Sequence, residues 1–305
     1  MKKDDYNKIF WRVGQEITPE TFIQADNYIT AQQNLIRKFL NRRYYGLFPV
    51  DENEAPSITV SARLNGMDVS IEQLRCQGIT RDGSLITFDG DLSSVVPCRL
   101  SLSAFSAGSC YVVLRILPFV QQLVEPVENE ETPLALPVWE FDVKDLQHIE
   151  GNELPVLKII YNQQYPEIDR RYIPPCMAVC SSQNLMEQYQ QFKQTVADIQ
   201  STLIHKREQF SPLIAPITLM LFDLEQISLN EPPWTLIQLL KKTIKIIGFF
   251  FKSLQLDPQA LHEPYIHDDI MRIIQALTQC FQDIQLFIGK QKAAIEEEED
   301  FTPKI

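Results

Sequence analysis

The stretch "HEPYIHDD" carries the side chains of this sequence that could most readily hold a metal ion: His262, Glu263, His267, Asp268 and Asp269. In a zinc-binding His-Glu-x-x-His motif, the two histidines stand about four residues apart on one face of a helix. Here the spacing is five, and Pro264 lies between the histidines where a helix is expected to begin. We therefore expect the carboxylates to stabilise the helix N-terminus through its dipole, and we predict no metal site.

A second candidate for zinc is the pair Cys176 and Cys180, which flank Met-Ala-Val in an expected strand and would share one face of it. A structural zinc site needs further ligands, and no second Cys or His pair lies nearby, so we interpret both as small core residues. The sequence has no G-x-S-x-G, Walker or dinucleotide-binding motif. We predict no catalytic residue, no cofactor and no enzymatic activity. The alternative to this prediction is that the chain is an enzyme, either a hydrolase or a metal-dependent enzyme, that uses His262 and His267.

The net charge of −12 argues against binding nucleic acid through its phosphates and against docking on anionic lipid. The most apolar stretch, residues 236–254, is interrupted by lysines at a density that a membrane span does not tolerate. The six cysteines lie in apolar contexts, which is typical of a reducing compartment. We predict a cytoplasmic protein with no nucleic-acid partner and no membrane insertion.

Residues 1–180 are expected to form a β-rich domain preceded by an arm and one helix. From about Tyr44 to Val179 the apolar residues alternate with period two between turn residues, as in "MDVSIEQLRC", "CYVVLRILPF" and "LPVLKIIY". Several such strands without helices between them favour an antiparallel β-sandwich or barrel-like domain. The predicted fold class is therefore α+β, with this domain first.

Residues 181–295 are expected to form an up-and-down four-helix bundle, because after Ser181 the apolar period lengthens to that of a helix. The first helix shows this most clearly, and its predicted core stripe is Leu185, Tyr189, Phe192, Val196, Ile199 and Leu203. Proline-containing segments such as "DPQALHEP" are interpreted as turns between helices. The acidic residues 296–305 are expected to form a flexible tail.

The last two long helices carry a second apolar row beside the first. One interpretation is that both rows are buried inside the bundle of a single chain. The other is that one row packs against a sister chain, and a coiled-coil-like homotrimer would bury both. The residues assigned to that oligomer interface are Leu236, Leu239, Ile246, Phe250, Ile274, Phe281 and Ile288.

The N-terminal stretch is interpreted as an element that binds a partner. Thr18 is expected to cap a helix and Pro19 to occupy its first turn, where the missing N–H costs nothing. Trp11 precedes the helix on a short linker, and it either inserts into a partner or packs on its own domain. The residues assigned to partner binding are Trp11, Pro19, Phe22, Gln24, Asp26 and Tyr28.

Two stretches resemble a known family. Trp11 to Tyr28, "WRVGQEITPETFIQADNY", resembles the start of the TssK family of type VI secretion baseplate subunits, which opens with a tryptophan, a short linker, a proline and a Phe-Gln-x-x-Asp/Gln helix. Leu154 to Leu185 is similar to the family's Leu-Pro-x-Leu-Lys strand, its Tyr/Phe-Ile-Pro-Pro turn and the Ser-x-x-Leu start of the bundle. The residues of that turn, assigned to the domain junction, are Tyr172, Ile173, Pro174 and Pro175.

The resemblance implies a shell domain that binds baseplate wedge proteins of the TssF and TssG kind, followed by a helical neck that forms a homotrimer. The family's C-terminal head, which contacts the membrane complex, has no counterpart before Ile305. We therefore expect a short form of the subunit without that head. The alternative from the residues alone is a phage-tail-like adhesin, or a ligand-binding β-sandwich on a helical stalk.

Overall fold

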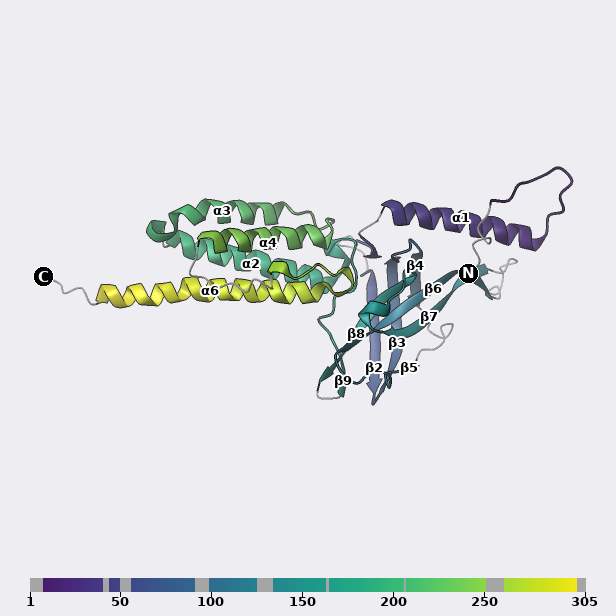
Figure 1. The fold of residues 1–305 in the computed structure, drawn as a ribbon, viewed down its shortest axis with the longest axis horizontal. Coiled ribbons are helices and arrows are strands. Elements are labelled where there is room, and N and C mark those ends of the chain that lie inside the picture. The colour runs from purple at the N-terminus through teal and green to yellow at the C-terminus, as the bar shows by residue number, and fades with distance from the viewer. Residues whose placement is uncertain are drawn as a thin grey trace. The chain divides into compact units, whose positions relative to one another are not determined.

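The computed structural model describes residues 8–40, 44–49, 56–90, 99–124, 134–162, 165–205, 207–250 and 261–300. The chain divides into two compact units, Met1–Pro175 and Cys176–Ile305 (Figure 1). We call them the N-terminal unit and the helical unit. The sequence placed the corresponding boundary between residues 180 and 181.

The N-terminal unit contains two antiparallel sheets. In the first, β3 (Asp68–Ile79) pairs with each of the other strands, which are β1 (Gly46–Leu47), β2 (Ile58–Asn65), β4 (Leu85–Gly90) and β5 (Arg99–Ser101). In the second, the strand order is β7-β6-β8-β9, and the strands are β6 (Ser109–Val124), β7 (Leu134–Lys144), β8 (Glu153–Asn162) and β9 (Tyr165–Ile168). A β-rich N-terminal part with antiparallel pairing is therefore confirmed.

The core of the N-terminal unit is densest around β6. Val112, Val113 and Leu114 are consecutive and fully buried, so this strand is covered on both of its faces. The two sheets touch through Phe88 of β4 and Trp139 of β7, whose rings meet edge to face at 5.8 Å. Such aromatic pairs add to the free energy gained by burying the apolar surface itself.

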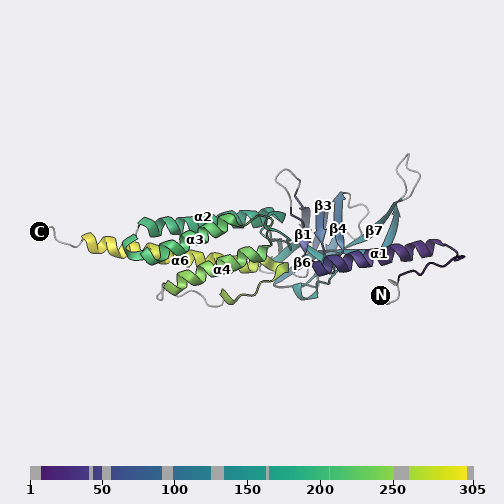
Figure 2. The same cartoon turned by 90° about the horizontal axis from the view of Figure 1, so that it is seen from above.

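The helical unit contains α2 (Gln183–His205), α3 (Arg207–Gln226), α4 (Pro233–Phe250) and α6 (Ile270–Asp300), which lie side by side in Figures 1 and 2. The short 3-10 helices η3 (Val179–Ser181) and η4 (His267–Asp269) precede α2 and α6. All six residues of the stripe predicted for the first helix are buried, which confirms that prediction. Contacts join α2 to α3, α3 to α4, α4 to α6 and α6 to α2.

The direction of α6 differs from the up-and-down order predicted. The ring of Trp234, in the first turn of α4, meets the ring of Tyr265 at 5.2 Å, and Tyr265 lies shortly before α6. The Nζ of Lys241 also donates to the carbonyl of Glu263 at 2.7 Å. The chain has thus returned to the start of α4 before α6 begins, and α4 and α6 run in the same direction. Residues 257–260 of the segment "DPQALHEP", which was interpreted as a turn, lie outside the described residues.

One further boundary differs from that predicted. Helix α6 continues through residues 296–300, where the acidic tail was expected to begin, and residues 301–305 lie outside the described residues. Ala, Glu and Lys, which dominate this end of α6, are strong helix formers. Helix α3 begins at Arg207, before Pro212, and contains both Pro212 and Pro216. None of the helices in the described part of the chain combines the length and apolar character that a bilayer span requires.

Candidate partner-binding site on the N-terminal arm and helix α1

Residues 8–18, which we call the N-terminal arm, present large apolar side chains to solvent. Phe10, Trp11 and Ile17 are 76%, 51% and 59% exposed. A turn at Gly14, whose φ of 80° suits glycine, is closed by Gln15 N donating to the carbonyl of Arg12. The aromatic residues are neighbours in the sequence, and the turn leaves their side chains uncovered. The arm therefore has the composition of a binding segment.

Helix α1 (Pro19–Leu40) begins at the proline that the sequence placed in its first turn. The cap is formed by Thr18 and Thr21 together: Thr18 N donates to Thr21 Oγ1 at 2.7 Å, and that hydroxyl donates to the carbonyl of Thr18 at 2.6 Å. The third helical residue therefore reaches back to the capping residue, as in one half of a capping box. These hydrogen bonds between Thr18 and Thr21 set the position at which the arm ends and the helix begins.

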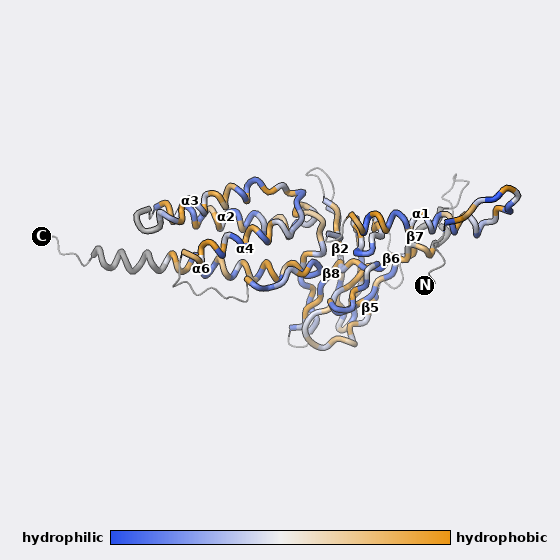
Figure 3. Tube along the Cα trace, turned by 45° about the horizontal axis from the view of Figure 1, so that its top comes forward, coloured by the Kyte–Doolittle hydropathy of each residue, from blue (hydrophilic) through white to orange (hydrophobic). Residues whose placement is uncertain are grey.

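Helix α1 has an apolar face that is uncovered in the single chain. Phe22, Ile29 and Ile36 are 60%, 52% and 57% exposed, and Figure 3 shows hydrophobic and hydrophilic colours alternating along this helix. Other exposed large apolar residues of α1 are Ile23, Leu35, Phe39 and Leu40. Monomeric proteins rarely expose large contiguous apolar patches, so we expect another molecule to cover the face that carries Phe22, Ile29 and Ile36.

The side of α1 that contacts the turn between β3 and β4 is polar. Asn34 is the residue of α1 that is buried, and its Nδ2 donates to Ser84 Oγ at 3.2 Å. Arg37 Nη1 in turn donates to Asn34 Oδ1 at 3.1 Å. Gly83, in the turn between β3 and β4, lies directly against the backbone of Asn34. These contacts attach the helix while Phe22, Ile29 and Ile36 stay exposed.

All six residues predicted to bind a partner therefore lie at or near the surface of the arm and α1. Trp11, Phe22 and the polar Gln24 are exposed, as are Pro19 and Asp26, and Tyr28 is half-buried. Trp11 does not enter the core of the N-terminal unit. Partner binding by these residues stays a prediction.

The predicted junction residues are built into the core of the N-terminal unit. Tyr172 and Ile173 are buried, and the ring of Tyr172 meets that of Tyr111 at 5.6 Å. The carbonyl of Pro175 accepts a hydrogen bond from Leu47 N at 2.8 Å. The chain is thus firmly held up to the last residue of the unit.

No protein-family model and no curated protein matches this sequence. The structure, by contrast, is similar to several solved structures. A TssK crystal structure matches over 92% of this chain and 69% of its own, with a TM-score of 0.62 and 14% identity. A chain of the type VI secretion TssK–TssF–TssG baseplate subcomplex matches over 90% of this chain and 99% of its own, with a TM-score of 0.57 and 16% identity.

TssK of the EAEC type VI secretion system, solved with a nanobody, matches over 83% of this chain and 97% of its own, with a TM-score of 0.52 and 16% identity. The chain has the fold of TssK. The similarity extends over both units, so it includes the stretch between the two sequence motifs.

Within this TssK-like fold, the seven residues predicted for an oligomer interface divide into two groups. Leu236, Ile274, Phe281 and Ile288 are at most 2% exposed, so a single chain already covers them. The rings of Phe281 and Phe192 of α2 meet at 5.7 Å, because α6 packs against α2 as well as α4 and has a neighbour for each row. Leu239 and Ile246 are half-buried, and Phe250 is 41% exposed.

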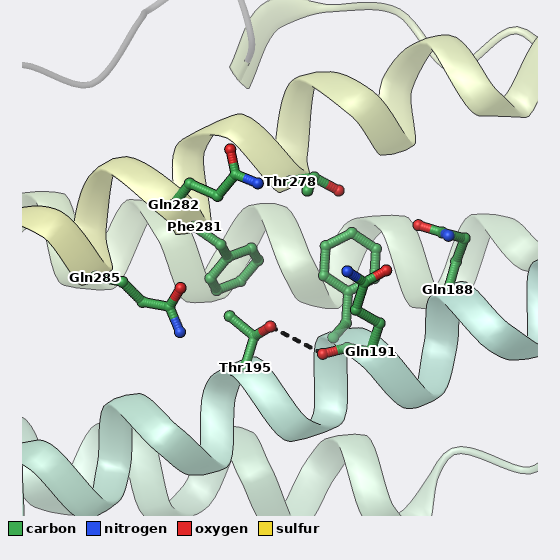
Figure 4. Close-up of a pocket in the computed structure, with 8 residues that line it drawn as sticks. Gln188, Gln191, Thr195, Thr278, Phe281, Gln282 and Gln285 are labelled. Carbon is green, nitrogen blue, oxygen red and sulfur yellow. Dashed lines mark hydrogen bonds between the residues drawn. The ribbon is translucent and has the colours of Figure 1, made fainter.

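The surface between α2 and α6 of the TssK-like fold holds a small cleft of about 100 Å³. Amide and hydroxyl side chains from both helices line it, together with two buried phenylalanine rings (Figure 4). Thr195 Oγ1 is not free, since it donates to the carbonyl of Gln191 at 2.9 Å. The side chains that line this cleft are all uncharged. Its lining is Gln188, Gln191, Phe192, Thr195, Thr278, Phe281, Gln282 and Gln285.

The side chains considered as metal ligands in the sequence make contacts with other residues in the structure. Glu263 pairs with Arg272 at 2.5 Å, and His267 Nδ1 lies 2.7 Å from the hydroxyl of Tyr265. Cys176 and Cys180 do not share a strand, because η3 begins at Val179, and Cys180 Sγ donates to Asn230 Oδ1 at 3.3 Å. Burial raises the pKa of Cys176, so its thiol stays protonated. In the described residues, no three metal-ligating groups come together.

Proposed function

We propose that this chain is a non-enzymatic structural subunit of a bacterial type VI secretion baseplate, working in the cytoplasm as a homotrimeric connector. In this proposal the two sheets form a sandwich-like shell, and the four long helices form a bundle that acts as the neck. The partners are wedge proteins of the TssF and TssG kind. Solved TssK structures, including one from a TssK–TssF–TssG subcomplex, have this fold, and that likeness is the main support.

The uncovered apolar surface of the arm and α1 supports a role in assembly. Trp11 and Phe22 are both more than half exposed, although the chain has a well-formed core in the same unit. Aromatic side chains of this kind dominate the binding free energy of many interfaces. We assign the wedge contact to the arm and the first turns of α1, the region that holds the six predicted residues.

The proposal is tested by co-expressing the full chain with the TssF-like and TssG-like proteins of the same genome and purifying the complex. We expect the wedge proteins to co-purify with the wild type. Replacing Trp11 and Phe22 by Ser should reduce the amount recovered by at least about tenfold, because each change removes a large apolar contact. Thermal melting should be nearly unchanged, since both side chains are exposed in the free chain.

The matched control is Gln32→Ser, an exposed polar position of α1. It should leave the recovered amount of wedge protein as in the wild type. Absence of any co-purification with the wild type would contradict the baseplate role. Equal recovery with the double variant would contradict the assignment to the arm.

A further inference from the structure

Helix α4 carries a groove of about 460 Å³ that the proposed function does not use. Its lining combines cations with large apolar side chains on the outer face of the helix. We call it the lysine–phenylalanine groove, and its residues are Gln238, Lys241, Lys242, Lys245, Ile246, Phe249 and Phe250.

The apolar part of the groove is exposed to solvent. Phe249 is 75% exposed and Phe250 is 41% exposed, and their rings meet edge to face at 5.6 Å. Ile246 lies one turn before them and is half-buried. An aromatic pair held in a fixed arrangement but left in water gains free energy when an apolar side chain covers it.

The charged side chains that line the groove are all cationic. Of the residues that line it in the described part of the chain, three are lysines and none is acidic. This concentration of positive charge contrasts with the net charge of −12 for the whole chain. Burial, together with the neighbouring Lys245, lowers the pKa of Lys241. An anion bound in the groove would offset the repulsion among these lysines.

Two occupants from this protein itself fit poorly. Contact between the same face of two copies would bring the three lysines of one copy close to those of the other, and like charges repel. The acidic residues 296–300 of the same chain lie too far along α6. That helix runs parallel to α4 and has 31 residues against 18, so on the order of 20 Å of it extends past the end of α4.

We propose that the lysine–phenylalanine groove binds an acidic amphipathic segment of a partner protein. The segment places its carboxylates against Lys242 and Lys245 and a large apolar side chain on Phe249 and Phe250. Recognition of an amphipathic segment by a groove that matches both its charge and its apolar face is a recurrent mode of binding. The groove lies in the helical unit, so this contact is separate from the one assigned to the arm, and it stands independently of the baseplate role.

The test uses the full chain and a labelled synthetic peptide of about 16 residues, with glutamates flanking a helical stripe of Leu and Phe. Binding is measured by fluorescence anisotropy. We expect Lys242→Glu and Lys245→Glu each to weaken binding by at least about tenfold, because each replaces attraction by repulsion. Phe249→Ser should weaken it through loss of the apolar contact. Lys241 is left unchanged because it holds the carbonyl of Glu263.

The matched control is Lys193→Glu on α2, which lies outside the groove and should bind the peptide as the wild type does. A peptide with Gln in place of Glu should bind at least about tenfold more weakly. Equal binding of the two peptides would overturn the proposal. So would phosphatidylglycerol vesicles that bind through the same lysines, or a change in molar mass by light scattering in Lys242→Glu, since these outcomes assign the groove to lipid or to a second copy.

Discussion

Glu153, at the start of β8, is a carboxylate with a fully buried side chain between two cations. Its Oε1 accepts from Arg115 Nε at 2.8 Å and from Lys144 Nζ at 2.6 Å, and its Oε2 accepts from Glu150 N at 2.7 Å. Burial by itself would raise the pKa of Glu153, but these hydrogen bonds outweigh it and hold the pKa below its ordinary value of 4.5. The ionised form is therefore part of the folded state.

We predict that Glu153→Gln lowers the free energy of unfolding at neutral pH by about 3 kcal/mol, because it leaves buried cations without their partner. The folded pKa is depressed, so the stabilisation is complete above the unfolded pKa and is lost as the pH falls through the folded value. The difference between wild type and variant should therefore shrink below about pH 4.5. Urea unfolding at several pH values measures both effects.

The control for this prediction is Glu72→Gln. Glu72 pairs with Arg63 at 3.1 Å, but both side chains are largely exposed. Surface pairs contribute less than about 1 kcal/mol, so this variant should stay close to the wild type at every pH. A Glu153 variant as stable as this control would contradict the structural role of the buried carboxylate.

At the scale of the element, α1 is attached by a small polar contact although it is an amphipathic helix. The attachment depends on Gly83, whose φ of 94° and contact with Asn34 both require the absence of a side chain. A Cβ at Gly83 would collide with the backbone oxygen of Asn34, which cannot move without the helix. The position of the arm therefore depends on a single glycine in a turn of the sheet.

We predict that Gly83→Ala detaches α1 while the sheets remain folded. Hydrogen exchange followed by mass spectrometry should show faster exchange of the α1 amides by at least about tenfold, with the β6 amides unchanged. The control is Gly66→Ala, which also has a positive φ, of 65°, but has no atom within 4 Å of the added methyl group. That variant should cost about 1–2 kcal/mol through backbone strain and leave the exchange of α1 as it is. Unchanged exchange of α1 in Gly83→Ala would disprove this attachment.

At the scale of the whole molecule, the chain leaves a second apolar surface uncovered, which we assign to contact between copies. Besides α1, the outer face of α3 exposes Leu219 at 61% and Phe222 at 56%. These two residues lie on one stripe of the helix, opposite the buried residues Leu213, Ile217 and Leu224. This stripe carries no lysine, unlike the outer face of α4, and is better suited to contact between copies.

We predict a homotrimer at micromolar concentration by light scattering, and we expect Leu219→Glu with Phe222→Glu to lower the measured molar mass. Two charges buried in an apolar contact cost far more than such a contact supplies. The control is Gln190→Glu, which adds a charge at an exposed position of α2 and should leave the mass unchanged. A wild type that is monomeric throughout would rule out the trimeric connector, whereas a stable trimer in the double variant would place the contact elsewhere.

The sequence by itself determined the features that depend on neighbours along the chain. The spacing of apolar residues predicted the buried stripe of α2 from Leu185 to Leu203 and the strands around Cys110 and Leu154. The threonine–proline pair predicted the start of α1. Short strands such as β1 and β5 escaped prediction because two or three residues carry no period, and β2 because its apolar alternation is weak. Two motifs were enough to suggest the TssK fold.

The tertiary structure alone decided which apolar face has a neighbour. The second row of α6, through Ile274 and Phe281, is buried inside one chain because α6 turns out to lie between α2 and α4, whereas the equally apolar face of α1 is left open. The spacing of apolar residues shows that a face of a helix is apolar, but the residues that cover that face come from segments distant in sequence. Their position depends on the path of the chain between helices, and no local pattern encodes that path.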